Sequence, residues 1–211
     1  MKPILLALLV VTGCGGDDGA PGTPADASPV DAAAVDAGAV DAPAPAVDAP
    51  PTVPLTVTST AFADLAAIPT DNTCSGANTS PPLAWTGAPA ATKSFAIVLS
   101  DAFFSPPLLH WVIYDIAASA TSVPASIENT DMPASVAGAT QLVSVHSPTI
   151  GYYGPCPPSP PAHTYQFTVY ALDVAQLPGV TKNSSRDAAL LAIASHQIAS
   201  GVLTGTYTKP K

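Results

Sequence analysis

The sequence predicts a mainly β domain, a sandwich of short strands with one or two helices, behind a disordered N-terminal tether. From residue 55 onward, short runs rich in β-branched and aromatic residues alternate with clusters of Pro, Gly, Ser and Asn. One segment near the C-terminus carries helix signals instead. The first quarter contains no aromatic residue. A chain of 211 residues accommodates one such domain together with extra segments.

Residues 1–13 have the layout of an export signal. Lys2 precedes the apolar run Ile4–Val11, which is far too short to cross a bilayer as a helix. The following Val-Thr-Gly-Cys, ending at Cys14, resembles the bacterial lipobox, whose cysteine is lipidated and becomes the mature N-terminus. The alternatives are an ordinary signal peptide or an incidental apolar start. We expect an envelope protein anchored in the membrane through Cys14, and Gly15 is compatible with the outer membrane.

Residues 14–54 are interpreted as the lipidated cysteine followed by a disordered, acidic linker. The linker repeats Val-Asp-Ala, and eight prolines between Pro21 and Pro54 break any long helix. Such a composition cannot bury enough apolar surface to offset the entropy of ordering. A flexible coil of about 40 residues holds a domain roughly 35 Å from its anchor. A role in adhesion or wall binding is the alternative to a spacer.

Charge and cysteine content narrow the possible partners and the redox state. The net charge is −9, and from residue 55 on eight acids face five bases, so we expect no nucleic-acid partner. With Cys14 assigned to lipid, Cys74 and Cys156 remain as a pair in an oxidising compartment. They are predicted to form a disulfide that closes a loop of roughly 80 residues and stabilises the fold by up to ~4 kcal/mol. The alternative is two buried free thiols.

The domain is predicted to occupy residues 55–211. A helix is predicted near residues 185–200, with Ser184 as its cap and Asp187 three residues on. Its buried stripe is predicted at Leu191, Ala194 and Ile198, and Gly201 would end it. The predicted strands are, in chain order, Leu55–Phe62, Ser94–Asp101, His110–Ile116, Thr164–Asp173 and Gly201–Tyr207.

Four polar side chains at strand ends are candidates for a functional site. Asp101 ends one predicted strand, His110 opens the next, and His163 and Tyr165 open a third. Residues i and i+2 of a strand face the same way, so His163 and Tyr165 project together. If the strands are neighbours, all four side chains meet at one rim. The proline-rich loop Gly154–Pro161 would then form a rigid wall beside them.

Each candidate also has a structural explanation. A histidine at a strand end is more often a surface residue than a ligand contact, and an aspartate after a strand is usually a turn former. We assign His146 and His196 to this structural group, with His196 as a helix-packing residue.

Four segments of the domain resemble the phosphatidylethanolamine-binding protein family, in its bacterial Raf-kinase-inhibitor-like branch. These are Thr73–Ala102, "LHWVIYDI", "GYYGPCPPSPPAHTYQFTVYALD" and "SHQIASGVLTGTY", in the family's order. The resemblance implies a β-sandwich of Greek-key type with a small anion-binding pocket at one end. It assigns the pocket to Asp101, His110, His163 and Tyr165, and its wall to Gly154, Cys156 and Pro157.

Two positions depart from the family pattern and leave the identity of the ligand open. Phe103 stands where the family usually has a second Asp, which makes the rim more apolar. Thr164 stands where an Arg is usual, which removes a cation. We expect no cofactor.

The leading functional hypothesis is an exported protein that binds a phosphate or phospholipid head group. Imidazolium N–H and phenol O–H groups are suitable donors to such an anion, and both histidines would be partly charged at neutral pH, so binding would tighten as the pH falls. A zinc or iron site of two His and a carboxylate is less favoured, because no metal-ligand spacing is present. Catalysis is not expected, since no nucleophile motif occurs. The remaining alternative is an inhibitor or regulator of an envelope hydrolase or another partner protein.

Overall fold

The computed structural model describes residues 53–146, 148–158 and 160–211. The predicted signal peptide, Cys14 and all but the last two residues of the predicted linker lie outside the described residues. No described helix has both the length and the apolar character that crossing a bilayer requires. In chain order the elements are β1 (Val53–Pro54), β2 (Thr56–Thr58), the 3-10 turn η1 (Thr70–Asn72), β3 (Leu83–Thr86), β4 (Ser94–Asp101), β5 (Leu108–Ala117), β6 (Ser122–Val123), the 3-10 turn η2 (Ala134–Val136), β7 (Thr140–Gln141), β8 (His163–Leu172), α1 (Arg186–His196) and β9 (Gln197–Tyr207).

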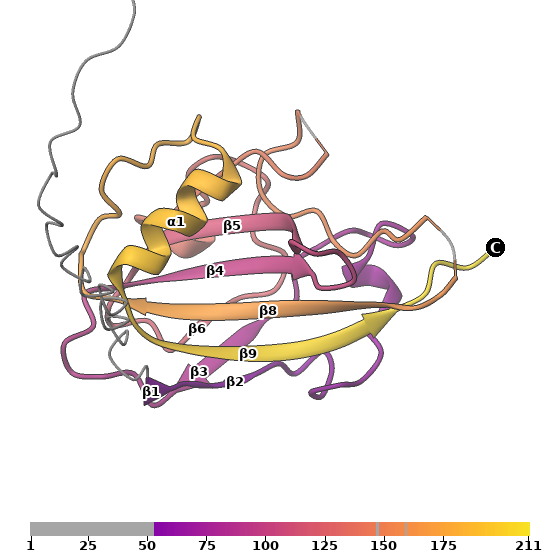
Figure 1. Cartoon of the computed structure of the whole chain (residues 1–211), viewed down its shortest axis with the longest axis horizontal. Helices are drawn as coiled ribbons and strands as arrows, with labels where there is room; N and C mark the ends of the chain where they lie inside the picture. Colours follow the sequence, from indigo (N-terminus) through magenta and orange to yellow (C-terminus); the bar gives the residue numbers. More distant parts are fainter. Residues whose placement is uncertain (1–52, 147, 159) are drawn as a thin grey trace, which may run out of the picture. The chain divides into compact units, whose positions relative to one another are not determined.

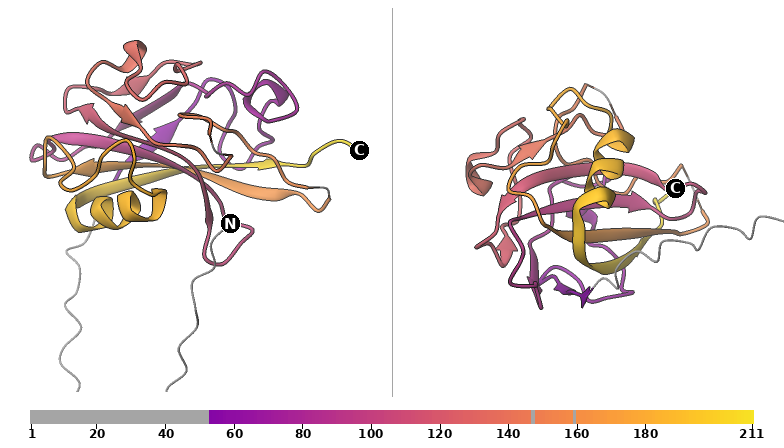
Figure 2. Two further views of the ribbon diagram at one scale, coloured as in Figure 1. Left: turned by 90° about the horizontal axis from the view of Figure 1, so that it is seen from above. Right: turned by 60° about the vertical axis from the view of Figure 1, so that its left-hand side comes forward.

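Two sheets pack face to face, and α1 covers the other face of the larger one. The larger sheet has the strand order β1-β9-β8-β4-β5-β7, and the smaller sheet has the order β2-β3-β6. Figure 1 shows α1 lying over the large sheet. Figure 2 (left) shows α1 on one side of that sheet and the small sheet on the other. The predicted mainly β sandwich is therefore confirmed.

The central strand β4 is buried along its whole length because both of its faces are covered. Phe95, Ile97 and Leu99 pack into the core between the two sheets. Ala96 and Val98 pack into a second core beneath α1. A strand covered on both faces reads as a continuous apolar run, which explains why the sequence "FAIVL" shows no alternation. Its neighbour β8 alternates buried and half-buried residues instead.

Helix α1 forms, but its cap and its buried face differ from the prediction. Ser185, not Ser184, is the cap, and its Oγ accepts a hydrogen bond from the Ala188 N–H at 3.1 Å. The buried residues are Ala189 and Ile193, whereas Leu191 is 71 % exposed. An alanine-rich helix presents several weakly apolar faces, and the position of the sheet decided which one was buried.

The ends of two predicted elements are also wrong. The helix ends at His196 and not at Gly201, because the chain continues directly into β9 at Gln197. The predicted strand 55–62 is regular only over Thr56–Thr58. β1 consists of the last two residues of the predicted linker, and it pairs in parallel with Ala199 and Ser200 of β9. The short strands β3, β6 and β7 were not predicted, because runs of two to four residues carry no readable period.

The corrected phase of α1 is testable with a matched pair of truncations. Ile193→Ala removes a fully buried side chain and is expected to lower the free energy of unfolding by about 2–4 kcal/mol. Leu191→Ala truncates an exposed side chain and is expected to change that free energy by no more than about 0.5 kcal/mol. Urea denaturation measures both. If Leu191→Ala lowers the free energy of unfolding more than Ile193→Ala does, the buried face predicted from the sequence is correct and the one described here is wrong.

Candidate functional site

Three of the candidate side chains lie at one end of the large sheet, where β4 ends and β8 begins. The two strands pair antiparallel in unbroken register, from Ser94 opposite Leu172 to Asp101 opposite Tyr165. Asp101 continues the row of β4 side chains that face the small sheet, and Tyr165 packs into the same inter-sheet core. His163, two residues before Tyr165, shares its face. The alternation of β4 and β8 therefore brings Asp101, His163 and Tyr165 together.

A β-bulge in β5 turns His110 toward the same face. Leu99 of β4 pairs with Trp111, and Ser100 pairs with Leu109, so His110 has no opposite residue on β4. Strict alternation would place Leu109 and Trp111 on one face, but Leu109 packs beneath α1 and Trp111 packs between the sheets. The bulge thus lets His110 and Trp111 both face the small sheet, a common use of bulges beside functional sites.

Asp101 and His163 form a buried pair. The Nδ1–H of His163 donates to Oδ2 of Asp101 at 2.7 Å, and the exposed fractions of the two residues are 3 % and 2 %. The other carboxylate oxygen, Oδ1, accepts from the Phe103 backbone N–H at 3.0 Å. Both oxygens of Asp101 are therefore occupied, and the His163 ring is oriented so that Nε2 is its remaining polar atom.

His110 is oriented by backbone carbonyl groups. Its Nδ1–H lies 3.3 Å from the Tyr153 oxygen and 3.2 Å from the Gly154 oxygen, and donates to both. Burial lowers the pKa of His110 below its usual value of 6.5, although the two carbonyls and the Asp101 charge partly oppose this shift. This shift favours the neutral form of the His110 ring at neutral pH, whereas the sequence analysis expected a partly charged ring. Its Nε2 is left for a ligand.

Tyr165 lies between the two imidazoles. Its ring centroid is 5.5 Å from that of His110 and 6.3 Å from that of His163. Its hydroxyl is buried and makes no hydrogen bond of good geometry with the described residues, although the Asp101 carboxylate and the Cys156 backbone lie near it. Burial and the neighbouring Asp101 carboxylate both raise the pKa of Tyr165, so the hydroxyl keeps its proton and remains a donor.

The proline-rich loop forms the wall beside His110. A disulfide joins Cys74 to Cys156, so the loop is tied to the segment after η1. The Gly154 N–H donates to Oδ1 of Asn78 at 2.8 Å, and a Cβ at Gly154 would overlap the Asn72 carbonyl. Only glycine fits this close approach. Of the three predicted wall residues, Gly154 hydrogen-bonds a cluster side chain, Cys156 forms the disulfide, and Pro157 is buried next to it in the chain.

Two phenylalanines cover His163: Phe103, which the sequence analysis placed at the rim, and Phe104, which it did not place in the site. The Phe103 ring stacks on the imidazole, with centroids 3.9 Å apart and planes 7° apart. Phe104 meets the same ring edge-on at 5.6 Å. The four cluster side chains are at most 3 % exposed, so the site is nearly closed to solvent in this structure.

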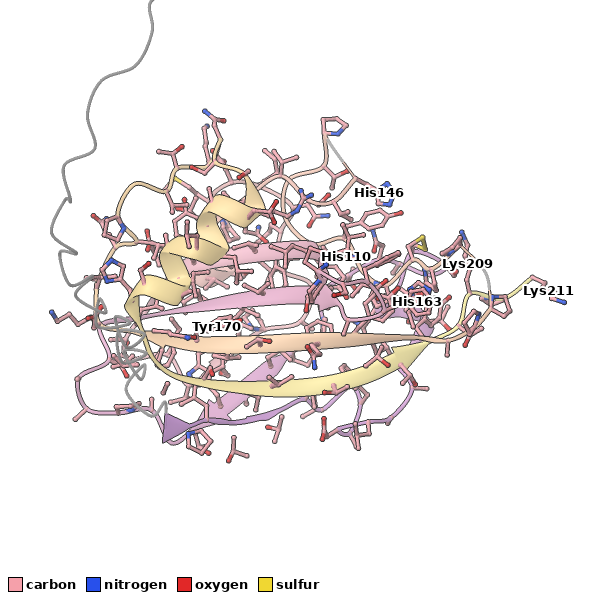
Figure 3. The ribbon with its side chains drawn as sticks, viewed as in Figure 1. His110, His146, His163, Tyr170, Lys209 and Lys211 are labelled. Atoms are coloured by element: carbon pink, nitrogen blue, oxygen red, sulfur yellow. A yellow bond between two sulfur atoms is a disulfide. The ribbon has the colours of Figure 1, made fainter. Side chains whose placement is uncertain are left out.

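Three further residues surround the cluster without having been predicted there. His146, which had been assigned a structural role, contacts Tyr153 with ring centroids 4.2 Å apart and planes tilted by 43°. Tyr153 supplies one of the carbonyls that orient His110. Lys209 lies 4.0 Å from the Cys156 sulfur. Figure 3 shows His110, His146, His163 and Lys209 at the same end of the domain, with Lys211 beyond them. No sequence spacing marks this association, because loop packing creates it.

Two other polar residues named in the sequence analysis, His196 and Thr164, have partners outside the cluster. His196 is the last residue of α1, and its Nδ1 lies 2.9 Å from Oδ1 of Asp173, so it is a partly exposed residue of the last turn and not the helix-packing residue that was predicted. Thr164 is half-buried, and its carbonyl accepts from the Ala102 N–H at 2.9 Å. Over residues 53–146, 148–158 and 160–211, no three His, Cys, Asp or Glu side chains gather closely enough to hold a metal ion.

Known proteins with the same fold match most of the chain. The YbcL protein of Escherichia coli, whose crystal structure is described as that of a new member of the mammalian PEBP family, superposes with a TM-score of 0.65 at 31 % identity. That match covers 74 % of this chain and 99 % of YbcL. The homolog CT736 of Chlamydia trachomatis superposes with a TM-score of 0.63 at 28 % identity, covering 75 % of this chain and all of that structure.

Sequence relatives and a family model agree with the structural matches. A UPF0098 protein of Methanothermobacter thermautotrophicus is 36 % identical over 152 residues, which cover 71 % of this chain and 95 % of the relative. LppC of Mycobacterium tuberculosis, named as a candidate lipoprotein, is 37 % identical over 162 residues, covering 75 % of each chain. The family model for phosphatidylethanolamine-binding protein matches residues 58–208. The chain therefore belongs to the phosphatidylethanolamine-binding protein family.

Proposed function

We propose that the cluster of Asp101, His110, His163 and Tyr165 binds a small anion with phosphate-like oxygens, as a free phosphate ester or as a phospholipid head group. The observation that carries this proposal is the buried Tyr165 hydroxyl, which lies between two imidazoles and makes no hydrogen bond of good geometry with the described residues. A buried donor without an acceptor costs about 1–3 kcal/mol. An oxyanion would supply that acceptor.

His110 can donate to the anion only after taking up a proton. Its Nδ1–H is already directed at two backbone carbonyls, and burial lowers its pKa. The remaining Nε2 is an acceptor in the neutral ring and a donor in the imidazolium. Anion binding is therefore coupled to proton uptake at Nε2 of His110.

The charges at this end of the domain also favour an anion over a cation. Each oxygen of Asp101 already accepts one protein N–H, which offsets part of the negative charge at the cluster. Lys209 and Lys211 lie at the same end and add positive potential. Binding without catalysis fits this arrangement, because the Cys156 sulfur is held in a disulfide and cannot act as a thiolate.

We also propose that the protein is held in the cell envelope by lipid at Cys14. The lipobox-like sequence ends at that residue, and the relative LppC is named as a candidate lipoprotein. Family membership and this anchor together describe a lipid-anchored anion-binding domain.

The role of the Tyr165 hydroxyl is tested by Tyr165→Phe. Since a hydrogen bond to a charged group contributes about 1.5–3 kcal/mol, the affinity for phosphoethanolamine is expected to fall roughly 10- to 100-fold. Folding stability is expected to stay level or rise, because the variant loses a buried hydroxyl without a partner. Tyr170→Phe makes the same chemical change on the helix-facing side of β8 and is expected to leave the affinity within about twofold. Unchanged affinity in Tyr165→Phe, measured by isothermal titration calorimetry, would count against the site.

Proton uptake predicts that binding tightens as the pH falls. Because the pKa of His110 is lowered, the free ring is neutral above pH 6.5 and must gain a proton when the anion binds. Each proton taken up changes the dissociation constant by about tenfold per pH unit. Sulfate is a suitable probe because its charge stays constant between pH 5 and pH 8. The slope of the logarithm of the sulfate dissociation constant against pH is expected to decrease by about one in His110→Gln, because the glutamine amide donates a hydrogen bond without titrating. An affinity of the natural protein that does not change with pH would refute the coupling.

Lipidation is tested in cells by labelling with a radioactive fatty acid. The natural chain is expected to take up the label and to fractionate with membranes, whereas Cys14→Ser is expected to lose both properties. If Cys14→Ser retains the label, the lipid is attached at another residue, and the proposed anchor at Cys14 is wrong.

A further inference from the structure

Two consecutive phenylalanines, Phe103 and Phe104, follow the end of β4 after the single residue Ala102. Phe103 is 53 % exposed and Phe104 is 44 % exposed, and their rings meet edge-to-face at 5.5 Å. Exposing two large aromatic side chains side by side forfeits the stabilisation that their burial would give. Their exposure at the mouth of a polar site indicates a contact that they make with something else.

Both rings are held against the site by the backbone around them. The Phe103 N–H donates to Oδ1 of Asp101, and the Ala102 N–H donates to the Thr164 carbonyl at 2.9 Å. These bonds fix the start of the loop to the ends of β4 and β8. The parallel stack of Phe103 on His163 then sets the position of the ring. Phe103 is therefore a preorganised apolar surface next to Nε2 of His163.

The apolar surface continues away from the polar cluster. Phe104, which contacts His163, also lines a groove of about 460 Å³. Most of the groove is apolar, and Arg186 and Asp187 add one charge of each sign. The other lining residues are Ser105, Pro106, Pro107, Leu108 and Leu109.

We propose that Phe103 and Phe104 make this site selective for an anion that carries an apolar or aromatic substituent, in preference to a bare phosphate or an aminoalkyl phosphate. The proposal rests on the anion-binding function above and adds the class of ligand. The oxyanion occupies the cluster of Tyr165 and the imidazoles, and the substituent lies against Phe103 and extends toward the groove beside Phe104.

The experiment compares three ligands that share a phosphate group and differ in its substituent. Isothermal titration calorimetry at pH 6 measures inorganic phosphate, phosphoethanolamine and phenyl phosphate against the natural domain, Phe103→Ala and Phe103→Asp, the last of which installs the family's usual residue. Leu191→Ala is the matched control, because it truncates an exposed apolar side chain on α1. Circular dichroism confirms folding of each variant, and substitution of the half-exposed Phe103 is expected to be tolerated.

The natural domain is expected to bind phenyl phosphate roughly 3- to 10-fold more tightly than the other two ligands. Phe103→Ala and Phe103→Asp are expected to remove that preference while still binding inorganic phosphate, and Leu191→Ala is expected to keep it. Equal affinity for all three ligands, tighter binding of phosphoethanolamine, or a preference that survives in Phe103→Ala would overturn the proposed selectivity and leave anion binding intact. Failure of the natural domain to bind any of the three would instead overturn the anion-binding function, and the selectivity with it.

Discussion

The unbroken pairing of β4 with β8 is the constraint on which the arrangement of the site depends. Eight consecutive residue pairs keep one register from Ser94 to Asp101. Because side chains alternate along a strand, a slip of one residue would turn Asp101 away from His163 and would expose the aromatic core residues of β8. The same register that packs Phe95 and Phe167 between the sheets therefore holds the buried Asp101–His163 pair at 2.7 Å.

The site is built from groups that do little for the stability of the fold. A neutral His110 inside the protein, a buried Tyr165 hydroxyl without a partner and a buried carboxylate all cost free energy of solvation. The surrounding apolar packing between the two sheets offsets this cost. Polar groups retained in so buried a position are understandable if a ligand completes their hydrogen bonds, which is why the same atoms support the proposed anion.

The wall and the cover of the site have different physical origins. The wall is held by a disulfide, by the close approach of Gly154 to Asn72 and by the Asn78 side chain, so its shape is largely set before a ligand arrives. The cover consists of two half-exposed phenylalanine rings, and Phe103 is held by its backbone bond to Asp101 and by its stack on His163. The family resemblance predicted the polar cluster and marked Phe103 as a departure from the family pattern, and the aromatic cover bears on which anion is proposed.

The sequence by itself determined the class of fold, the central strands and the residue types of the site. The apolar run of β4, the alternation of β8 and the order of motifs are local properties of the chain, and local properties are readable from spacing. Tertiary structure alone decided which face of α1 is buried, because Ala189 and Leu191 differ little in local propensity and the sheet selects between them. It also decided that His110 is neutral, that a bulge aims it at Tyr165, and that Phe103 stacks on His163. Burial, register shifts and ring contacts arise only when segments distant in the chain pack together, and no single segment encodes them.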